Sequence, residues 1–245
     1  MFPLRDTIPS RRPPIMTWVL IGLNVFVFGL EMTLPPDRLE TLFYMFGLVP
    51  ARFIGREWVG WVALPPEAYW SFFTNMFLHG GAAHLIGNMW TLWIFGDNVE
   101  DRMGSLRFLI FYVLCGLSAG ITHALLNPTS SVPAVGASGA ISGVLGAYFV
   151  LFPRAHVITF VPILFLPYFF VLPASVYLLL WFSIQFFSGT ASLFVSQGVG
   201  GIAWWAHIGG FVAGVVLHRL FVMPSLYGKR FADEYDYRGA WDRPF

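Results

Sequence analysis

The chain has 245 residues, of which 57% are hydrophobic, 18% aromatic and 11% charged, whereas an average soluble domain has about 25% charged residues. This composition excludes a water-soluble globular domain. The formal net charge is +1, so no strong electrostatic field points to nucleic acid or to an acidic partner. The single cysteine, Cys115, excludes an internal disulfide and a multi-cysteine metal site.

Four long stretches contain no Lys, Arg, Asp or Glu, namely 13–30, 68–96, 108–153 and 155–218. This absence predicts membrane-spanning helices, because a charge at the bilayer centre costs about 2.5–3.5 kcal/mol. A spanning helix needs about 20 mostly apolar residues, so the stretches have room for six helices. In chain order the expected helices cover 15–30, part of 68–96, 107–126, 138–152, 173–187 and 204–223.

The segments between the helices also carry signals. No small-residue cleavage site follows the first helix, which is therefore expected to stay uncleaved. The loop 32–69 is rich in aromatic residues, including Trp58 and Trp61, and is expected to lie in the membrane interface. The turn-forming cluster 127–133 separates the third helix from the fourth. Pro162, Pro167 and Pro173 predict an interfacial segment before the fifth helix.

The distribution of basic residues predicts the orientation, because short cytoplasmic loops retain Lys and Arg. With the N-terminus inside, only Arg38, Arg52 and Arg56 of the 14 basic residues fall outside. We therefore expect an all-α, multi-pass protein of the plasma or inner membrane with both termini in the cytoplasm. Its predicted parts are an N-terminal segment 1–14, a six-helix domain 15–223 and a polar tail 224–245.

A serine in a small-residue turn is the first candidate for chemistry. Gly136-Ala137-Ser138-Gly139 comes after a loop and at the start of the fourth helix, where amide groups can stabilise an anion. Ser138 is a candidate nucleophile if a base removes its proton. The structural alternative is that Ser138 caps the helix and that Gly139, Gly143 and Gly146 serve helix packing.

A histidine on the sixth helix could supply that base. His207, Gly210 and Gly214 follow at i, i+3 and i+7, so they share one helix face, and the two glycines permit close helix contact. If that face packs on the Ser138 helix, His207 reaches the serine as general base and then general acid. The alternative is a histidine that only hydrogen-bonds a carbonyl across a packed interface.

His84 and Asn88 lie at i and i+4 of the second helix, and both can donate hydrogen bonds to a developing oxyanion. They could equally form ordinary hydrogen bonds between helices. A metal site from His79, His84 and His207 is disfavoured, because no intramembrane carboxylate and no H-E-x-x-H pattern accompanies them. No acidic residue is placed as a third member, so a Ser138–His207 dyad is the simplest scheme.

These residues resemble the rhomboid family of intramembrane serine proteases, over roughly 15–223. The match rests on His84-x-x-x-Asn88, Gly136-x-Ser138-Gly139 and Ala206-His207-x-Gly209-Gly210-x-x-x-Gly214 in the family's order, and Glu100-Asp101-Arg102-Met103-Gly104 resembles its charged turn. The resemblance implies Ser138 as nucleophile, His207 as base, and His84, Asn88 and the Ser138 amide as oxyanion hole. It also implies cleavage of membrane-protein substrates in or near a transmembrane segment, without metal or cofactor.

One feature departs from the family. A Trp-Arg pair is common in the family's first external loop, and Tyr69-Trp70-Ser71 stands in its place, which leaves the contacts of that loop open. The loop 188–203 resembles the family's cap over the site. Two alternatives remain, a catalytically silent relative that binds membrane helices in quality control, and a transporter or channel lined by His84 and His207. No functional role is expected for His79, His123, His156, His218 or Cys115.

Overall fold

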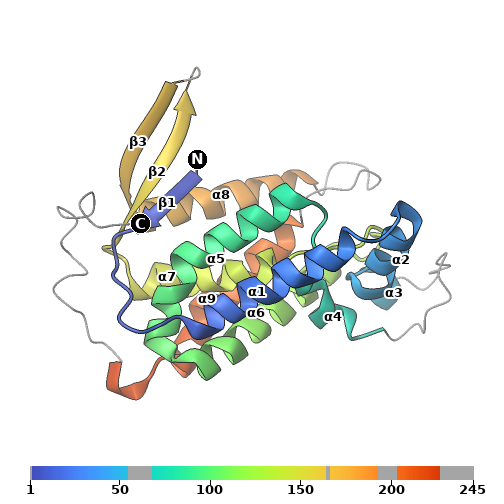
Figure 1. The fold of residues 1–245 in the computed structure, drawn as a ribbon, viewed down its shortest axis with the longest axis horizontal. Coiled ribbons are helices and arrows are strands. Elements are labelled where there is room, and N and C mark those ends of the chain that lie inside the picture. Colours follow the sequence, from blue (N-terminus) through green and yellow to red (C-terminus); the bar gives the residue numbers. More distant parts are fainter. Residues whose placement is uncertain (1, 55–67, 164–165, 193–202, 227–245) are drawn as a thin grey trace.

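The computed structural model describes residues 2–54, 68–163, 166–192 and 203–226. Within these ranges six helices of 14 residues or more pack side by side into a bundle (Figure 1). They are α1 (Ile15–Glu31), α5 (Ala82–Met103), α6 (Ser105–Leu126), α7 (Ser138–Leu151), α8 (Ala174–Ser192) and α9 (Trp204–Phe221). The shorter helices are α2 (Pro36–Phe46), α3 (Ala51–Ile54), α4 (Ser71–Thr74), η1 (Asn75–Phe77) and η2 (Pro224–Leu226).

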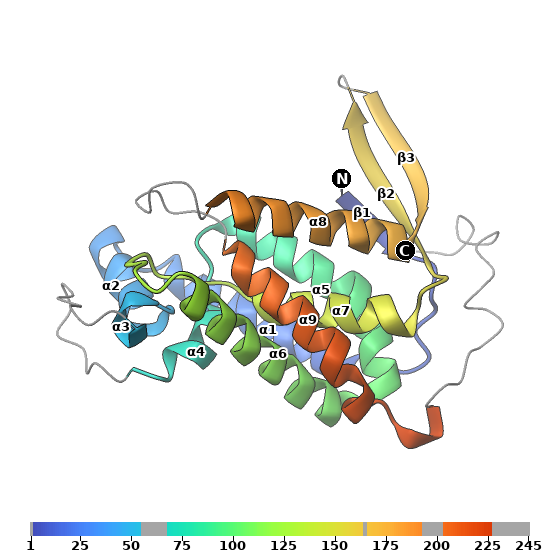
Figure 2. The same ribbon diagram turned by 180° about the vertical axis from the view of Figure 1, so that it is seen from behind.

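The bundle has two distinct ends. At one end, here the loop end, α2, α3 and α4 lie where α5, α7 and α9 begin (Figures 1 and 2). At the other, here the sheet end, a three-stranded antiparallel sheet in the order β1-β2-β3 lies where α8 begins. The strands are β1 (Phe2–Asp6), β2 (His156–Ile163) and β3 (Leu166–Pro173).

Helices α7 and α9 make the closest contact in the bundle, through glycines on both. A Cβ built on Gly210 would overlap the carbonyl oxygen of Gly139, and one on Gly214 would overlap that of Gly143. The absence of side chains therefore lets the two backbones touch, as small residues do between membrane helices. In this contact, here the glycine seam, the face of α9 that carries Gly210 and Gly214 packs on α7, which sets His207 against the start of α7.

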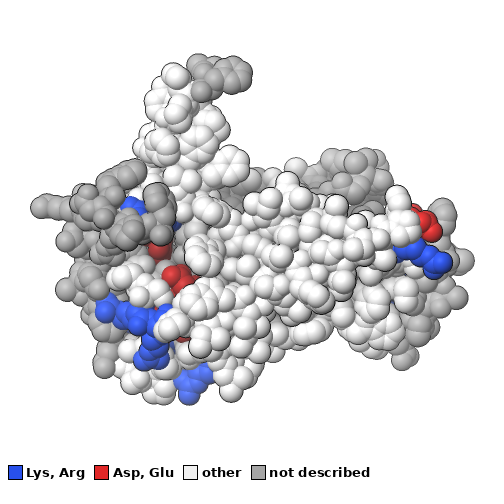
Figure 3. Space-filling view, in the orientation of Figure 1, with Lys and Arg blue, Asp and Glu red and all other residues white. Residues whose placement is uncertain are grey.

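Large apolar side chains are exposed around the bundle, among them Trp93 on α5, Leu180 on α8 and Leu220 on α9. Charged atoms gather at the two ends, with an uncharged belt between them on the face seen in Figure 3. Exposed apolar area on this scale marks a membrane-facing surface. By length and hydropathy α6 and α8 could span a bilayer, whereas α1 and α7 are apolar but shorter.

Buried carboxylates close the sheet end. The Glu100 carboxylate accepts hydrogen bonds from the backbone N–H groups of Met16 and Thr17, at 2.9 and 2.8 Å, and so caps the first turn of α1 from a distant helix. Asp6 of β1 accepts hydrogen bonds from the Tyr148 hydroxyl and the Asn98 amide. Burial and the neighbouring Asp97 raise the pKa of the Asp6 carboxyl well above its usual range.

The structure confirms the helical class. Most helix ends lie within two residues of the expected ones, but α5 continues to Met103, past the expected limit of 96, and α8 continues to Ser192 instead of 187. The prediction of six spans stays a prediction, as does the division into 1–14, 15–223 and 224–245. The strands were not predicted: β1 lies within the N-terminal segment, and β2 and β3 occupy the segment marked by Pro162, Pro167 and Pro173. Trp58, Trp61, much of the expected cap loop and the tail after 226 lie outside the described residues.

Candidate active site

Ser138 begins helix α7 at the loop end. Its backbone N–H belongs to the first turn, where amide groups have no acceptor inside the helix. Ser142, one turn later, donates its hydroxyl hydrogen bond to the Ser138 carbonyl at 2.6 Å. The Ser142 hydroxyl therefore bonds within α7, whereas the Ser138 hydroxyl can contact another helix.

His207 lies in the first turn of α9, and its Nε2 atom is 2.8 Å from the Ser138 hydroxyl oxygen. Two residues 69 positions apart in the chain are thus in hydrogen-bond contact. The glycine seam accounts for this placement, because it lets α9 approach α7 closely along the face that carries His207. The arrangement is that of a hydroxyl beside a base able to remove its proton.

Gln185 of α8 contacts the other side of the same imidazole. Its Oε1 atom lies 2.7 Å from His207 Nδ1, and Gln185 is only 6% exposed. Because an amide oxygen can only accept, Nδ1 carries the proton and Nε2 is left to accept from Ser138. The Trp181 ring, one turn earlier, packs beside the imidazole at a centroid distance of 6.0 Å.

The loop before Ser138 lies against α5. Gly136 has φ +129°, and a Cβ there would fall 2.7 Å from His84 Cε1 and 2.8 Å from His84 Nε2. Its N–H donates to the Asn75 carbonyl at 2.9 Å. Only glycine suits this backbone and this contact. His84 and Asn88 therefore flank the turn that leads into Ser138, as an oxyanion hole would require.

A further histidine, His79, holds Asn88 in place. The Asn88 side-chain amide lies 3.0 Å from His79 Nε2, and the His79 backbone N–H donates to the Glu31 carboxylate at 3.2 Å. Burial and the neighbouring His84 lower the pKa of His79 to about 4. His79 is therefore neutral at pH 7, and its Nε2 can accept from the Asn88 amide.

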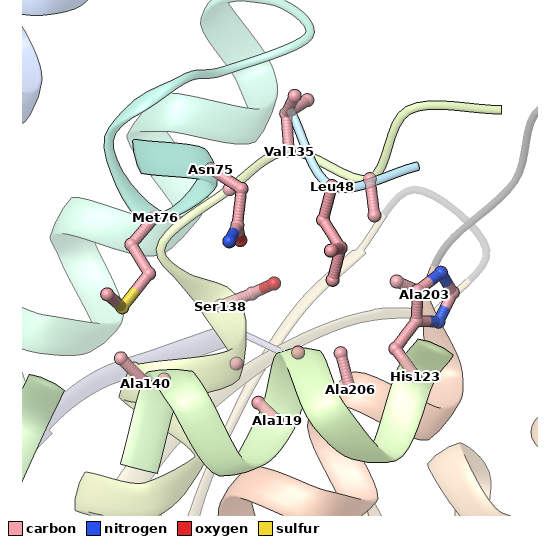
Figure 4. Close-up of a pocket in the computed structure, with 15 residues that line it drawn as sticks. Leu48, Asn75, Met76, Ala119, His123, Val135, Ser138, Ala140, Ala203 and Ala206 are labelled. Atoms are coloured by element: carbon pink, nitrogen blue, oxygen red, sulfur yellow. The ribbon is translucent and has the colours of Figure 1, made fainter. Parts of the chain in front are cut away.

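A small pocket opens beside Ser138. In Figure 4 the Ser138 hydroxyl points into it, between Asn75, Leu48 and His123. Most of its wall consists of glycine and alanine, so the space remains because side chains are small. The pocket is large enough for a water molecule.

No group of three His, Cys, Asp or Glu side chains able to hold a metal ion occurs among the described residues. The imidazoles of His79 and His207 each have another contact instead, to Asn88 and to Ser138 and Gln185. The contacts thus bring a serine hydroxyl, an imidazole and side chains able to donate hydrogen bonds close together, an arrangement compatible with acyl transfer.

Comparison with known proteins decides the family. The family model described as the Rhomboid domain matches residues 66–224, a range that contains the serine, the histidines and the glycine seam. The chain belongs to the rhomboid family. The rhomboid domain is a polytopic membrane fold, so the helices of this bundle, with their apolar outer surface, lie in a lipid bilayer.

Named rhomboid relatives align over parts of their length. Rhomboid protease GluP of Bacillus subtilis is 36% identical over 136 residues, 55% of this chain and 24% of that protein. The mitochondrial Rhomboid protein 1 of Saccharomyces cerevisiae is 28% identical over 209 residues, 83% of this chain and 52% of that protein. Putative rhomboid protease YdcA of Bacillus subtilis is 36% identical over 80 residues, 33% of this chain and 40% of that protein. The chain thus spans about a quarter to a half of these rhomboid relatives.

Several residues near Ser138 and His207 were not predicted to have a functional role. Gln185 is the main one, although a glutamine inside an apolar stretch is itself a signal, since a buried amide needs partners. His79 and His123, expected to be structural, lie next to Asn88 and in the pocket wall. Where the Trp-Arg pair was expected, the Trp70 indole donates to the Met45 carbonyl at 3.2 Å.

Proposed function

We propose that this protein is an intramembrane serine endopeptidase that hydrolyses peptide bonds in or near transmembrane segments of membrane-protein substrates. The 2.8 Å contact between Ser138 and His207 carries the proposal, because a serine and a histidine in that contact inside a membrane fold match an activated nucleophile. The relatives named as rhomboid proteases support the same reaction class.

In the acylation step, Ser138 Oγ attacks the scissile carbonyl carbon while His207 Nε2 takes the hydroxyl proton. The negative charge forms on the carbonyl oxygen, which receives hydrogen bonds from the Ser138 backbone amide and from the side chains of His84 and Asn88. Each such donor is worth about 2.7–4 kcal/mol in the transition state. His207 then gives its proton to the leaving amine, the C–N bond breaks, and an ester on Ser138 remains.

Water completes the cycle in the deacylation step. His207 Nε2 removes a proton from a water molecule, whose oxygen attacks the ester carbonyl. The ester bond breaks, Ser138 Oγ takes the proton back and the carboxylic acid is released. The pocket beside Ser138, with Asn75 and His123 in its wall, offers space for this water. The scheme uses no cofactor and no metal.

We place the sheet end in the cytoplasm of a cell whose plasma or inner membrane holds the protein. Support comes from the basic residues, because cytoplasmic loops retain them. Arg5, Arg11, Arg107 and Arg154 lie on or beside elements of the sheet end, whereas only Arg38 and Arg52 of the described residues belong to the loop end. The active site then opens toward the external side.

The test is cleavage of a labelled single-span substrate by the purified protein in detergent, with a chelator in a parallel reaction. We expect cleavage that the chelator leaves unchanged, and covalent labelling of Ser138 by a fluorophosphonate. Failure of both cleavage and labelling across a panel of substrates would overturn the proposal in favour of a silent helix-binding protein. Chelator-sensitive cleavage would contradict the mechanism.

Gln185 acts as a positioning residue in this scheme, and its replacement by leucine is expected to lower kcat about 3–10-fold, the value of one net hydrogen bond. The substrate does not contact Gln185 in the proposed reaction, so KM should stay nearly unchanged. Gln185→Glu keeps an acceptor for His207 Nδ1 and should restore most of kcat. The measurement is the initial rate against substrate mole fraction in liposomes.

Thr190→Val is the matched control for this substitution. Thr190 also lies on α8, and its hydroxyl donates only to the Phe186 carbonyl of the same helix. The control should leave both kinetic parameters unchanged. An unchanged kcat in Gln185→Leu, or a KM effect alone, would show that Gln185 has no part in orienting the imidazole.

A further inference from the structure

The hairpin of β2 and β3 stands apart from the bundle. Its two strands pair in register over eight residue pairs, from His156–Pro173 to Ile163–Leu166, and β1 covers only part of β2, from Val157 to Phe160. In Figures 1 and 2 the hairpin runs across the helix axes rather than along them. It therefore extends sideways from the sheet end of the bundle.

Both faces of strand β3 are apolar and exposed. Tyr168 and Phe169 point to opposite faces, since neighbouring strand residues alternate, and they are 42% and 53% exposed. Leu166 is 59% exposed. No charged residue occurs in 155–218, and the described residues of the hairpin are drawn as uncharged in Figure 3. A protein partner on one face would leave the other apolar face in water, whereas lipid can cover both.

The hairpin also continues the lipid-facing surface of the bundle. Helix α8 begins at Ala174, directly after β3, and its Leu179, Leu180 and Ile184 are exposed apolar residues. The depth is limited, however, because β3 is the edge of the sheet, and an open edge is excluded from the hydrocarbon core by its unpaired backbone groups. Aromatic side chains favour the interface instead.

We propose that the β2–β3 hairpin is a membrane-binding element that lies in the headgroup and upper acyl region of the monolayer at the sheet end. Its ligand is the phospholipid bilayer. The hairpin would lie about 5–10 Å below the membrane surface, as other interfacial segments do. The hairpin would fix the start of α8, the helix that carries Gln185, relative to the membrane. The inference rests on the family's membrane fold and not on the proposed reaction.

The test uses single cysteines labelled with an environment-sensitive dye in the full chain, in a Cys115→Ala background. Phe169→Cys and Tyr168→Cys probe the two faces of the hairpin, and the protein is reconstituted in phosphatidylcholine–phosphatidylglycerol vesicles. Leu180→Cys serves as the lipid-facing control. Glu40→Cys is the aqueous control, because it lies on the exposed face of α2 that also carries Asp37, and the charged face of an interfacial helix points to water. Thermal midpoints confirm that each variant is folded.

We expect both hairpin labels to be several-fold less accessible to aqueous iodide than the label at residue 40. Nitroxide on the lipid headgroup should quench them more than nitroxide near the acyl-chain end, with the reverse order at residue 180. Iodide accessibility equal to residue 40 would overturn the proposal. Low iodide accessibility without nitroxide quenching would also overturn it, and so would low accessibility that depends on the protein-to-lipid ratio. Either result would assign the hairpin to a protein partner or to a second copy.

Discussion

Ser138→Ala, His207→Ala and the double variant are expected to lose cleavage activity to the same residual level, about 10⁴-fold or more below the wild type. The two side chains act as one unit, because the 2.8 Å contact between them carries the proton transfer. Without His207, no base removes the Ser138 hydroxyl proton. Without Ser138, the His207 imidazole has no nucleophile to activate. Their effects should therefore not multiply in the double variant.

Initial rates on a labelled single-span substrate measure this cycle, and fluorophosphonate labelling reports the nucleophile separately. Ser142→Ala is the matched control, since Ser142 lies one turn along α7 and donates only to the Ser138 carbonyl. It should keep activity within a few-fold of the wild type. The dyad would be contradicted if the activity losses of the two single variants multiplied in the double variant. It would also be contradicted if Ser142→Ala were as inactive as Ser138→Ala.

Gly214→Ala is expected to destabilise the fold by about 1–3 kcal/mol, as overpacking of a tight contact does. A Cβ at Gly214 would overlap the backbone of Gly143, and a carbonyl oxygen cannot rotate away as a flexible side chain could. The two helices would have to separate along the glycine seam. Gly214 is one turn further from His207 than Gly210, so this variant tests packing with little direct effect on the chemistry.

Thermal unfolding in detergent, followed with a thiol-reactive dye, measures this change, because Cys115 is fully buried and reacts only when the bundle opens. The midpoint should fall by ~2–4 °C per kcal/mol. Gly87→Ala on α5 is the matched control, since a Cβ there meets no atom within 4 Å. Alanine favours a helix over glycine, so the control should be neutral or slightly more stable. Equal midpoints for both variants would contradict the prediction that close packing along the glycine seam stabilises the fold.

Local patterns were enough to predict much of the fold and the proposed nucleophile and base. The absence of charge located the helices. The 3.6-residue period placed His207 and Gly210 on one face of α9, and Gly210 packs on the backbone of α7. Ser138 could be singled out because small residues surround it. Its contact with His207 follows from helix packing that the glycines already indicate.

Other contacts between distant segments could not be predicted in this way. Gln185 reaches His207 from another helix, and no spacing within α8 reveals which imidazole nitrogen it meets. The strands were missed because 156–173 is almost uniformly apolar, so it lacks the alternation of a half-buried strand. The pairing of β1 with β2 depends on tertiary structure, as does the cap that Glu100 places on α1.

The sheet end has a consequence for biosynthesis. Strand β1 emerges from the ribosome long before its partners, since Asp6 and Tyr148 are 142 residues apart. At a usual rate of translation this delay is on the order of 10 s. During that interval the nascent β1 has no strand to pair with, and its polar groups need water. In the proposed orientation, the segment before α1 would therefore wait in the cytosol while α1, α5, α6 and α7 are inserted, and β1 would pair with β2 only afterwards.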